Sequence, residues 1–161
     1  MSIFEIMIET YQFNRTRTLS LLEKLEQEAD PRQALGWRPG TGRAHAAWQL
    51  MHIGVTEEIF ASERLAPDKP GSFTELWPRF RGGSTPDDDI PAPAQIRQVL
   101  ADGRAHLFDT LSRFDEGDLG MVPEALKQRN LTLRDVLHIL HFHEAHHQGQ
   151  AHITLNLFKA R

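Results

Sequence analysis

Apolar residues recur at helical spacing in four stretches of the chain, with polar residues between them. Because one face of an α-helix repeats about every 3.6 residues, this pattern predicts four amphipathic helices. They are expected to run from Ser2 to about Glu28, from Thr41 or Gly42 to about Leu65, from Pro93 or Ala94 to about Phe114, and from Asn130–Thr132 to Phe158. The predicted inward face of the first helix consists of Ile3, Ile6, Met7, Thr10, Phe13, Leu21, Leu22 and Leu25.

Local signals indicate where two of these helices end and begin. Asp30-Pro31 ends the first helix, because a proline disfavours the helical conformation of the residue before it, and a glycine-containing loop is expected to follow. Thr132 and Asp135 have the spacing of a capping box at the start of the fourth helix.

The segment Ala66–Ala92 is rich in proline and glycine and connects the second predicted helix to the third. A crossover of this length lets two successive helices of a four-helix bundle run parallel, whereas short connections give antiparallel neighbours. The expected fold is therefore all-α, a four-helix bundle with up-down-down-up order. Residues 1–161 are expected to form it as a single domain.

The composition narrows the class of protein. Hydrophobic residues make up 40% and charged residues 25%, which is typical of a soluble globular protein. The net charge of -4, without a basic run, argues against nucleic acid or an anionic membrane as the partner. The absence of cysteine excludes disulfides and thiolate ligands. No stretch resembles a membrane span, and Glu5 and Glu9 argue against a signal peptide, so we expect a cytoplasmic protein.

Five of the nine histidines lie between His138 and His147, on the fourth predicted helix. On a helical wheel of about 100° per residue, His147 falls about 40° from His143. The two share a face with the residues expected to line the core, Val136, Leu140, Thr154, Leu157 and Phe158. Three further histidines of this helix fall on the opposite side and are expected to be solvated: His138, His141 and His152.

Two imidazoles at positions i and i+4 of a buried face are either hydrogen-bonded core residues or two ligands of one divalent metal ion. A third inward histidine from another helix favours the metal site. His52 is the candidate, because it shares a face of the second predicted helix with Trp48 and Ile59.

Other polar residues of the second predicted helix receive different roles. Glu57 and Glu58 are expected on its solvated face. His45 lies about 10 Å from His52 along the helix axis, too far to share its metal, and is expected to line a pocket or to support a ligand. On the fourth helix, Glu144 and His146 are candidate proton acceptors.

Two alternatives explain part of the pattern. The run from His143 to His147 matches H-E-x-x-H, the zinc metalloprotease motif. However, the position of the extended motif's third histidine is Ile153, and only 14 residues follow His147. A purely structural bundle explains the apolar periodicity but not three inward histidines on two helices.

With these residues the sequence resembles the DinB/YfiT-like family of metal-dependent bundle proteins, over most of the chain. The most specific match is H-x-x-x-H-x-G-Q, here His143 to Gln150. The run Tyr11-Gln12-Phe13-Asn14 in the first helix and the late histidine of the second helix, His52, also match.

The resemblance implies a four-helix bundle in which His52, His143 and His147 hold one divalent ion, with water in the open positions. We expect Zn or Ni, with Mn or Fe as alternatives, since imidazole suits all four. The family commonly has Arg after the second histidine of the motif, where this chain has Gln148. The resemblance also implies a homodimer.

An open metal position can ionise water for hydrolysis, or bind a thiol that attacks an electrophile. Family members with an assigned activity include thiol S-transferases, so the resemblance favours a transferase with a low-molecular-weight thiol as cosubstrate and a small-molecule substrate. The residues themselves fit a hydrolase equally well. A non-catalytic metal- or ligand-binding protein of the stress response is the alternative to either enzyme.

Overall fold

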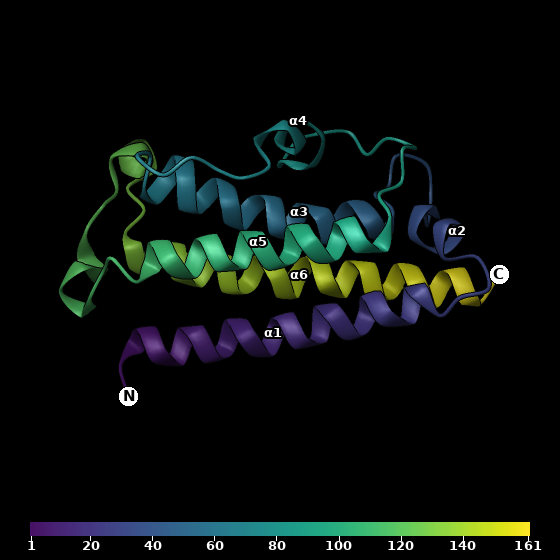
Figure 1. Ribbon diagram of the computed structural model, residues 1–161, viewed down its shortest axis with the longest axis horizontal. Coiled ribbons are helices and arrows are strands. Elements are labelled where there is room, and N and C mark those ends of the chain that lie inside the picture. Colours follow the sequence, from purple (N-terminus) through teal and green to yellow (C-terminus); the bar gives the residue numbers. More distant parts are fainter.

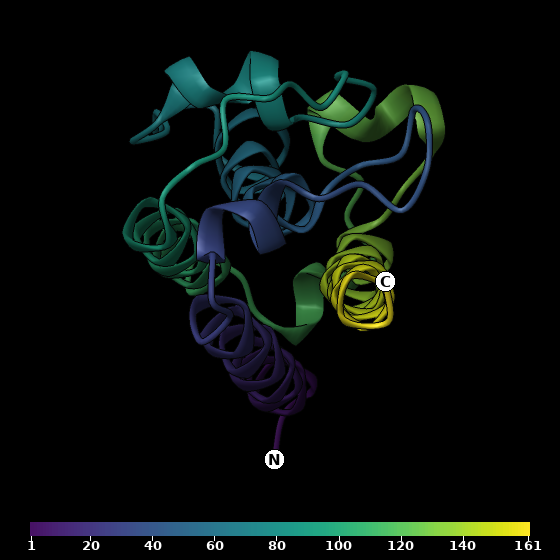
Figure 2. The same cartoon turned by 90° about the vertical axis from the view of Figure 1, so that its right-hand side faces the viewer.

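The computed structural model describes all 161 residues and contains helices and no strands, which confirms the all-α prediction. Four long helices carry the fold: α1 (Ile3–Glu26), α3 (Ala46–Ile59), α5 (Pro93–Leu111) and α6 (Leu133–Lys159). In Figure 1, α1 and α6 run from left to right, whereas α3 and α5 run from right to left. Figure 2 shows the four helices nearly end-on, with α1 opposite α3 and α5 opposite α6.

Short helices occupy the connections. They are α2 (Pro31–Gly36), the π-helix η1 (Phe60–Leu65), the 3-10 turn η2 (Thr74–Leu76), α4 (Trp77–Phe80), and the 3-10 helices η3 (Glu116–Gly120) and η4 (Glu124–Arg129). The predicted loop after Asp30 therefore begins with a helix, because the Asp30 side chain accepts a hydrogen bond from the backbone N–H of Gln33 and Pro31 occupies its first turn.

Side-chain caps fix the starts of three of the four long helices, α1, α3 and α6. Ser2 and Glu5 form a capping box before α1, and Thr132 and Asp135 form the predicted one before α6. The second long helix begins at Ala46, not at Thr41 or Gly42 as predicted. Gly42 has a φ of 72°, in the left-handed region, so the chain is still turning there.

His45 is the N-cap of α3, which differs from the role predicted for it. Its Nδ1 accepts a hydrogen bond of 3.0 Å from the backbone N–H of Trp48, and its Nε2–H donates to the carbonyl of Asp87 at 2.9 Å. The ring is 1% exposed and lines neither of the cavities beside His52. His45 thus starts α3 and fastens the crossover segment to it.

This cap should make the stability of the fold depend on pH. Burial lowers the pKa of His45 below its ordinary value of 6.5, so the unfolded chain takes up the proton first. The stability that His45 contributes is therefore complete above pH 6.5 and is lost as the pH falls toward the lowered pKa.

We expect the stability advantage of the wild type over His45→Asn, which keeps a cap but does not titrate, to shrink between pH 7.5 and pH 5. Chemical denaturation in a chelating buffer measures it, and the remaining histidines are common to both proteins. A constant difference across this range would show that His45 is not a neutral cap.

Helix α3 is buried over its whole length, so it has no solvated face. The crossover with α4 covers the side that the other long helices leave open, as Figures 1 and 2 show. The prediction that Glu57 and Glu58 are solvated is therefore wrong: they are 3% and 0% exposed. Glu58 accepts hydrogen bonds from the indole N–H of Trp77 and the backbone N–H of Ser72, both in the crossover segment.

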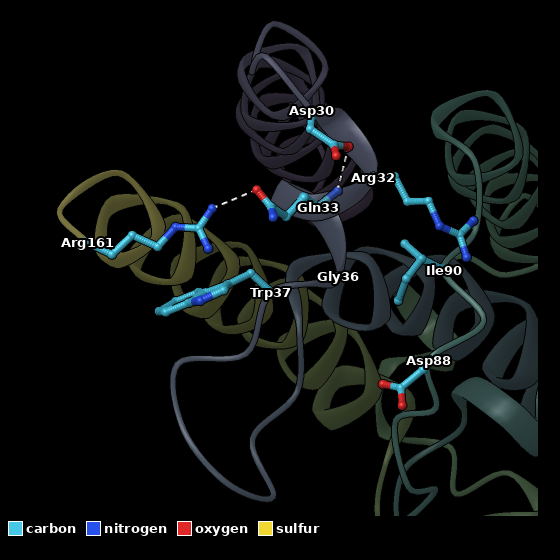
Figure 3. Close-up of a pocket in the computed structure, with 8 residues that line it drawn as sticks. All are labelled: Asp30, Arg32, Gln33, Gly36, Trp37, Asp88, Ile90 and Arg161. Atoms are coloured by element: carbon cyan, nitrogen blue, oxygen red, sulfur yellow. Dashed lines mark hydrogen bonds between the residues drawn. The ribbon is translucent and has the colours of Figure 1, made fainter.

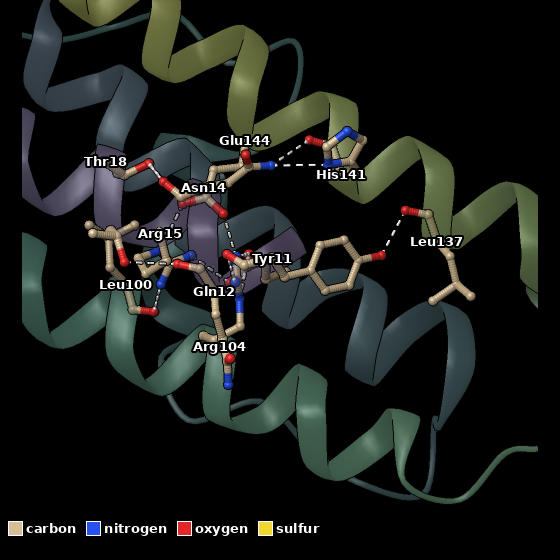
Figure 4. Close-up of polar contacts among 12 residues, drawn as sticks. Tyr11, Gln12, Asn14, Arg15, Thr18, Leu100, Arg104, Leu137, His141 and Glu144 are labelled. Carbon is tan, nitrogen blue, oxygen red and sulfur yellow. Dashed lines mark hydrogen bonds and ion pairs between the residues drawn. The ribbon is translucent and has the colours of Figure 1, made fainter. Parts of the chain in front are cut away.

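Glu57 belongs to a buried ion-pair tetrad that takes one residue from each long helix: Arg15, Glu57, Arg104 and Glu144. Figure 4 labels three of them, Arg15, Arg104 and Glu144. Arg15 donates to Glu144 at 2.8 Å and to Glu57 at 2.9 Å, and Arg104 donates to both carboxylates. All four carboxylate oxygens accept hydrogen bonds, one of them also from Thr18. The tetrad is neutral as a whole, so the four helices are joined by charges that compensate one another.

Two glycines let α3 and α5 pack closely. A Cβ added at Gly103 would lie 2.5 Å from the backbone oxygen of Gly54, and one added at Gly54 would lie 2.7 Å from that of Val99. Larger residues at these positions would separate the helices.

Some residues predicted for the core are exposed instead: Ile3, Ile6, Phe13 and Leu157. The first three lie in the N-terminal half of α1, which in Figure 1 diverges from the other helices. No helix is both long enough and apolar enough to cross a membrane.

Candidate metal centre

His52 of α3 and His143 and His147 of α6 come together as predicted. One ring nitrogen from each lies within 4.8 Å of the other two. The ring centroids are 4.4–4.7 Å apart, and the Nε2 atoms of His52 and His143 are separated by 3.0 Å. His52 is 5% exposed, and the other two are partly buried. The i, i+4 spacing places both histidines of α6 opposite α3.

Hydrogen bonds outside the cluster orient two of the rings. The Nδ1–H of His52 donates to the carbonyl of Phe80, the last residue of α4, because a carbonyl can only accept. The Nδ1–H of His147 donates in the same way to Oε1 of Gln49. In a neutral ring the remaining nitrogen, Nε2, then carries a lone pair, and in both residues it is free for the cluster. Trp48 stacks on the ring of His52, with centroids 4.6 Å apart.

The surroundings keep these imidazoles neutral. Burial and then the neighbouring histidines lower the pKa of His143 to about 3 and that of His147 to about 2. Burial also lowers the pKa of His52, opposed by its hydrogen bond to Phe80. Neutral imidazole is the form that binds metal ions.

The three rings fit a divalent cation. The Nε2 lone pair of His52 faces Nε2 of His143 at 3.0 Å, so the two atoms need a proton or a cation between them. With Nε2 of His147 available as well, the donor set is three neutral nitrogens without a carboxylate or thiolate. A divalent ion held by these three ligands would keep further coordination positions open, which is typical of catalytic rather than structural zinc sites.

The cluster forms part of the wall of a cavity of about 360 Å³. Apolar side chains make up much of the remaining wall: Ile59, Phe60, Leu126, Leu131 and Ile139. Trp48 and Gln49, which contact the histidines, line a second cavity of about 440 Å³. A small molecule therefore has space beside the cluster.

A third cavity, of about 450 Å³, lies elsewhere, where α2 meets the C-terminal end of α6 (Figure 3). Polar residues of its wall bond to one another, as in the hydrogen bond that Arg161 donates to Gln33. It contains no histidine and no set of groups that could hold a metal. Of these three cavities, the one beside the histidine cluster has a wall that contains a group of residues able to hold a metal ion.

The family model of the DinB superfamily matches residues 10–151, which include all three histidines. The chain belongs to the DinB superfamily. No curated protein and no solved structure gives a significant match. The resemblance found in the sequence is thus confirmed for the family, and the histidine cluster lies within the matched region.

In this DinB-superfamily chain, the two predicted proton acceptors do not face the cavity. Glu144 is 1% exposed and is held in the ion-pair tetrad by Arg15 and Arg104 (Figure 4). This placement also removes the metalloprotease alternative, in which that glutamate must face the metal ion. His146 is exposed, bonds with Gln150 and packs edge-on against His147.

The other residues of the DinB-like motifs have structural contacts. Tyr11 donates a hydrogen bond of 2.7 Å to the carbonyl of Leu137, and Asn14 contacts His141, so both fasten α1 to α6 (Figure 4). His138 is exposed as predicted, whereas His141 and His152 are partly covered. Gln148 lines a separate small cavity beside α1.

Sequence reasoning missed four residues that shape the site. Gln49 follows no periodic signal that distinguishes it from any polar residue of a helix. Arg64, Arg81 and Arg129 line the histidine cavity from the two connections on either side of α5, whose packing has no sequence period.

Proposed function

We propose that this up-down-down-up helical bundle is a metalloprotein in which His52, His143 and His147 hold one divalent ion. The observation that supports this most directly is the convergence of three neutral ring nitrogens within 4.8 Å, two of them aimed inward by hydrogen bonds to Phe80 and Gln49. Zn and Ni head the candidate ions, with Mn and Fe as alternatives, since all accept imidazole.

We further propose that the site is that of a transferase or hydrolase acting on a small molecule. Held by these histidines, a divalent ion would supply Lewis-acid chemistry, which lowers the pKa of a water or a thiol. The chain contributes the neutral ligands, the hydrogen bonds that orient them and an apolar wall that limits water around the reacting groups. Family membership favours a low-molecular-weight thiol as cosubstrate.

A non-catalytic role in binding a metal or ligand is the second candidate. It is favoured by the position of Glu144 and His146, which leaves the cavity without the proton acceptors predicted for it. Retention of a bound ligand without turnover would distinguish this role from the enzyme.

The metal ligands are tested by substitution. We expect one equivalent of Zn to bind the wild type and none to remain, after passage over a desalting column, on His147→Ala or His52→Ala. The control is His138→Ala, on the exposed side of the same helix, which should bind zinc like the wild type. Elemental analysis measures the stoichiometry, and circular dichroism verifies folding. Equal zinc content in all variants would contradict the assignment of these histidines as metal ligands.

A further inference from the structure

Three arginines line the same cavity as the three histidines. Two lie in the connection between α3 and α5, and one lies in the connection between α5 and α6. Arg64 lies in the π-helix η1 at the end of α3, Arg81 follows α4 directly, and Arg129 ends the 3-10 helix η4. Segments far apart in the sequence thus bring three arginines to the wall of one cavity.

These positive charges are weakly compensated. No carboxylate lines the cavity. Glu63 is the acid that pairs with Arg64 and Arg81, at 3.8 Å from each, longer than the roughly 2.7–2.9 Å of a charge-assisted hydrogen bond. Arg129 makes no ion pair. Because three arginines and no carboxylate line the cavity, whereas the chain as a whole carries a net charge of -4, the cavity is a positive region on an acidic protein.

The rest of the lining limits what can bind. The apolar wall, with Phe60 and Ile139 among its residues, suits a hydrocarbon portion. A volume of about 360 Å³ lies near the lower end of the range for ligand cavities and therefore suits a small ligand.

We infer that the ligand of this site is a small oxyanion with a short apolar portion, a carboxylate or a phosphate monoester, held by Arg64, Arg81 and Arg129 beside the histidines. Guanidinium groups match both oxyanions, because their N–H groups form paired hydrogen bonds. The inference rests on the proposed function, in that it names the ligand class of the same site. It assigns the charge preference to the arginines and not to the metal ion.

The test uses hexanoate, hexyl phosphate and the neutral hexanamide, titrated calorimetrically into zinc-loaded and into chelator-treated protein. We expect at least one of the two anions to bind about tenfold or more tightly than hexanamide in both preparations. The tighter of the two anions identifies carboxylate or phosphate as the preferred group.

Substitutions of single arginines show which residues cause the preference for anions over hexanamide. Arg81→Gln and Arg129→Gln should each weaken anion binding about five- to tenfold while leaving hexanamide unaffected. Arg134→Gln, which removes the same charge from an exposed position on α6, should leave anion binding unchanged. Hexanamide binding as tightly as both anions would overturn the inference, as would an equal loss in Arg134→Gln or a preference seen only with zinc.

The two proposals fail separately. The wild type could take up no zinc and still prefer anions, with this preference lost in the Arg129→Gln variant. That result would contradict the metalloprotein and support the anion site. Stoichiometric zinc with no anion preference would contradict the anion site alone. Zinc content is therefore measured for every arginine variant, and we expect it to equal that of the wild type.

Discussion

Replacing Glu144 with alanine should lower the free energy of unfolding by about 3–5 kcal/mol, the cost of breaking a buried ion pair from one side. The substitution leaves the guanidinium groups of Arg15 and Arg104, each 8% exposed, with Glu57 as their remaining carboxylate. The hydroxyl of Thr18 also loses its acceptor on Glu144. Urea denaturation at pH 7, monitored by circular dichroism, measures the change in the free energy of unfolding.

Two variants separate the tetrad from other roles of Glu144. Arg113→Ala breaks the exposed pair with Asp68 and should leave stability nearly unchanged. Glu144→Gln keeps the size of the side chain but removes its charge, so we expect a smaller loss than with alanine and full zinc binding. A Glu144→Ala protein as stable as Arg113→Ala would show that the tetrad does not hold the four helices together.

The long helices could be predicted because their apolar positions repeat and their ends carry local signals. The capping box of Thr132 and Asp135 is such a signal, and it is present in the structure. The start of α3 was predicted too early, because His45 acts as its cap and histidine is not among the residues that usually cap helices.

The predicted burial of a side chain is wrong where that burial depends on residues distant in the sequence. Glu57 and Glu58 are expected to be solvated, because charged residues are seldom buried unless they are paired, and the sequence shows no partner for them. Their partners come from α1, α5 and the crossover segment, at sequence separations that no periodicity reveals. Phe13 shows the opposite error: it keeps the apolar spacing of α1 but is 67% exposed, because its neighbours Tyr11 and Asn14 face α6 and Phe13 lies on the outer side of the helix.

The histidine cluster could be predicted in part for the same reason as the helices. The spacing of His143 and His147 guarantees that they share a face, and His52 has the matching inward position on α3. Nothing in the spacing reveals that Glu144, next to His143, turns away into the tetrad. The arginines of the cavity were not predicted, because they lie in connections whose course depends on the packed bundle.

Saturation with zinc should raise the free energy of unfolding by about 4 kcal/mol when free zinc exceeds its dissociation constant a thousandfold. The stabilisation arises because the three ring nitrogens are assembled only in the folded chain. A chelator should remove it and still leave a folded protein, since the two clusters of buried apolar side chains contain no histidine. Thermal unfolding with and without EDTA measures both effects.

His147→Ala provides the control for this stabilisation. It should unfold at the same temperature with and without zinc, because the cluster then lacks one of its three nitrogens. Complete unfolding of the wild type by a chelator at room temperature would contradict the view that α1, α3, α5 and α6 are held together by apolar packing and the ion-pair tetrad. An equal zinc-dependent shift in His147→Ala would place the stabilising ion elsewhere on the protein.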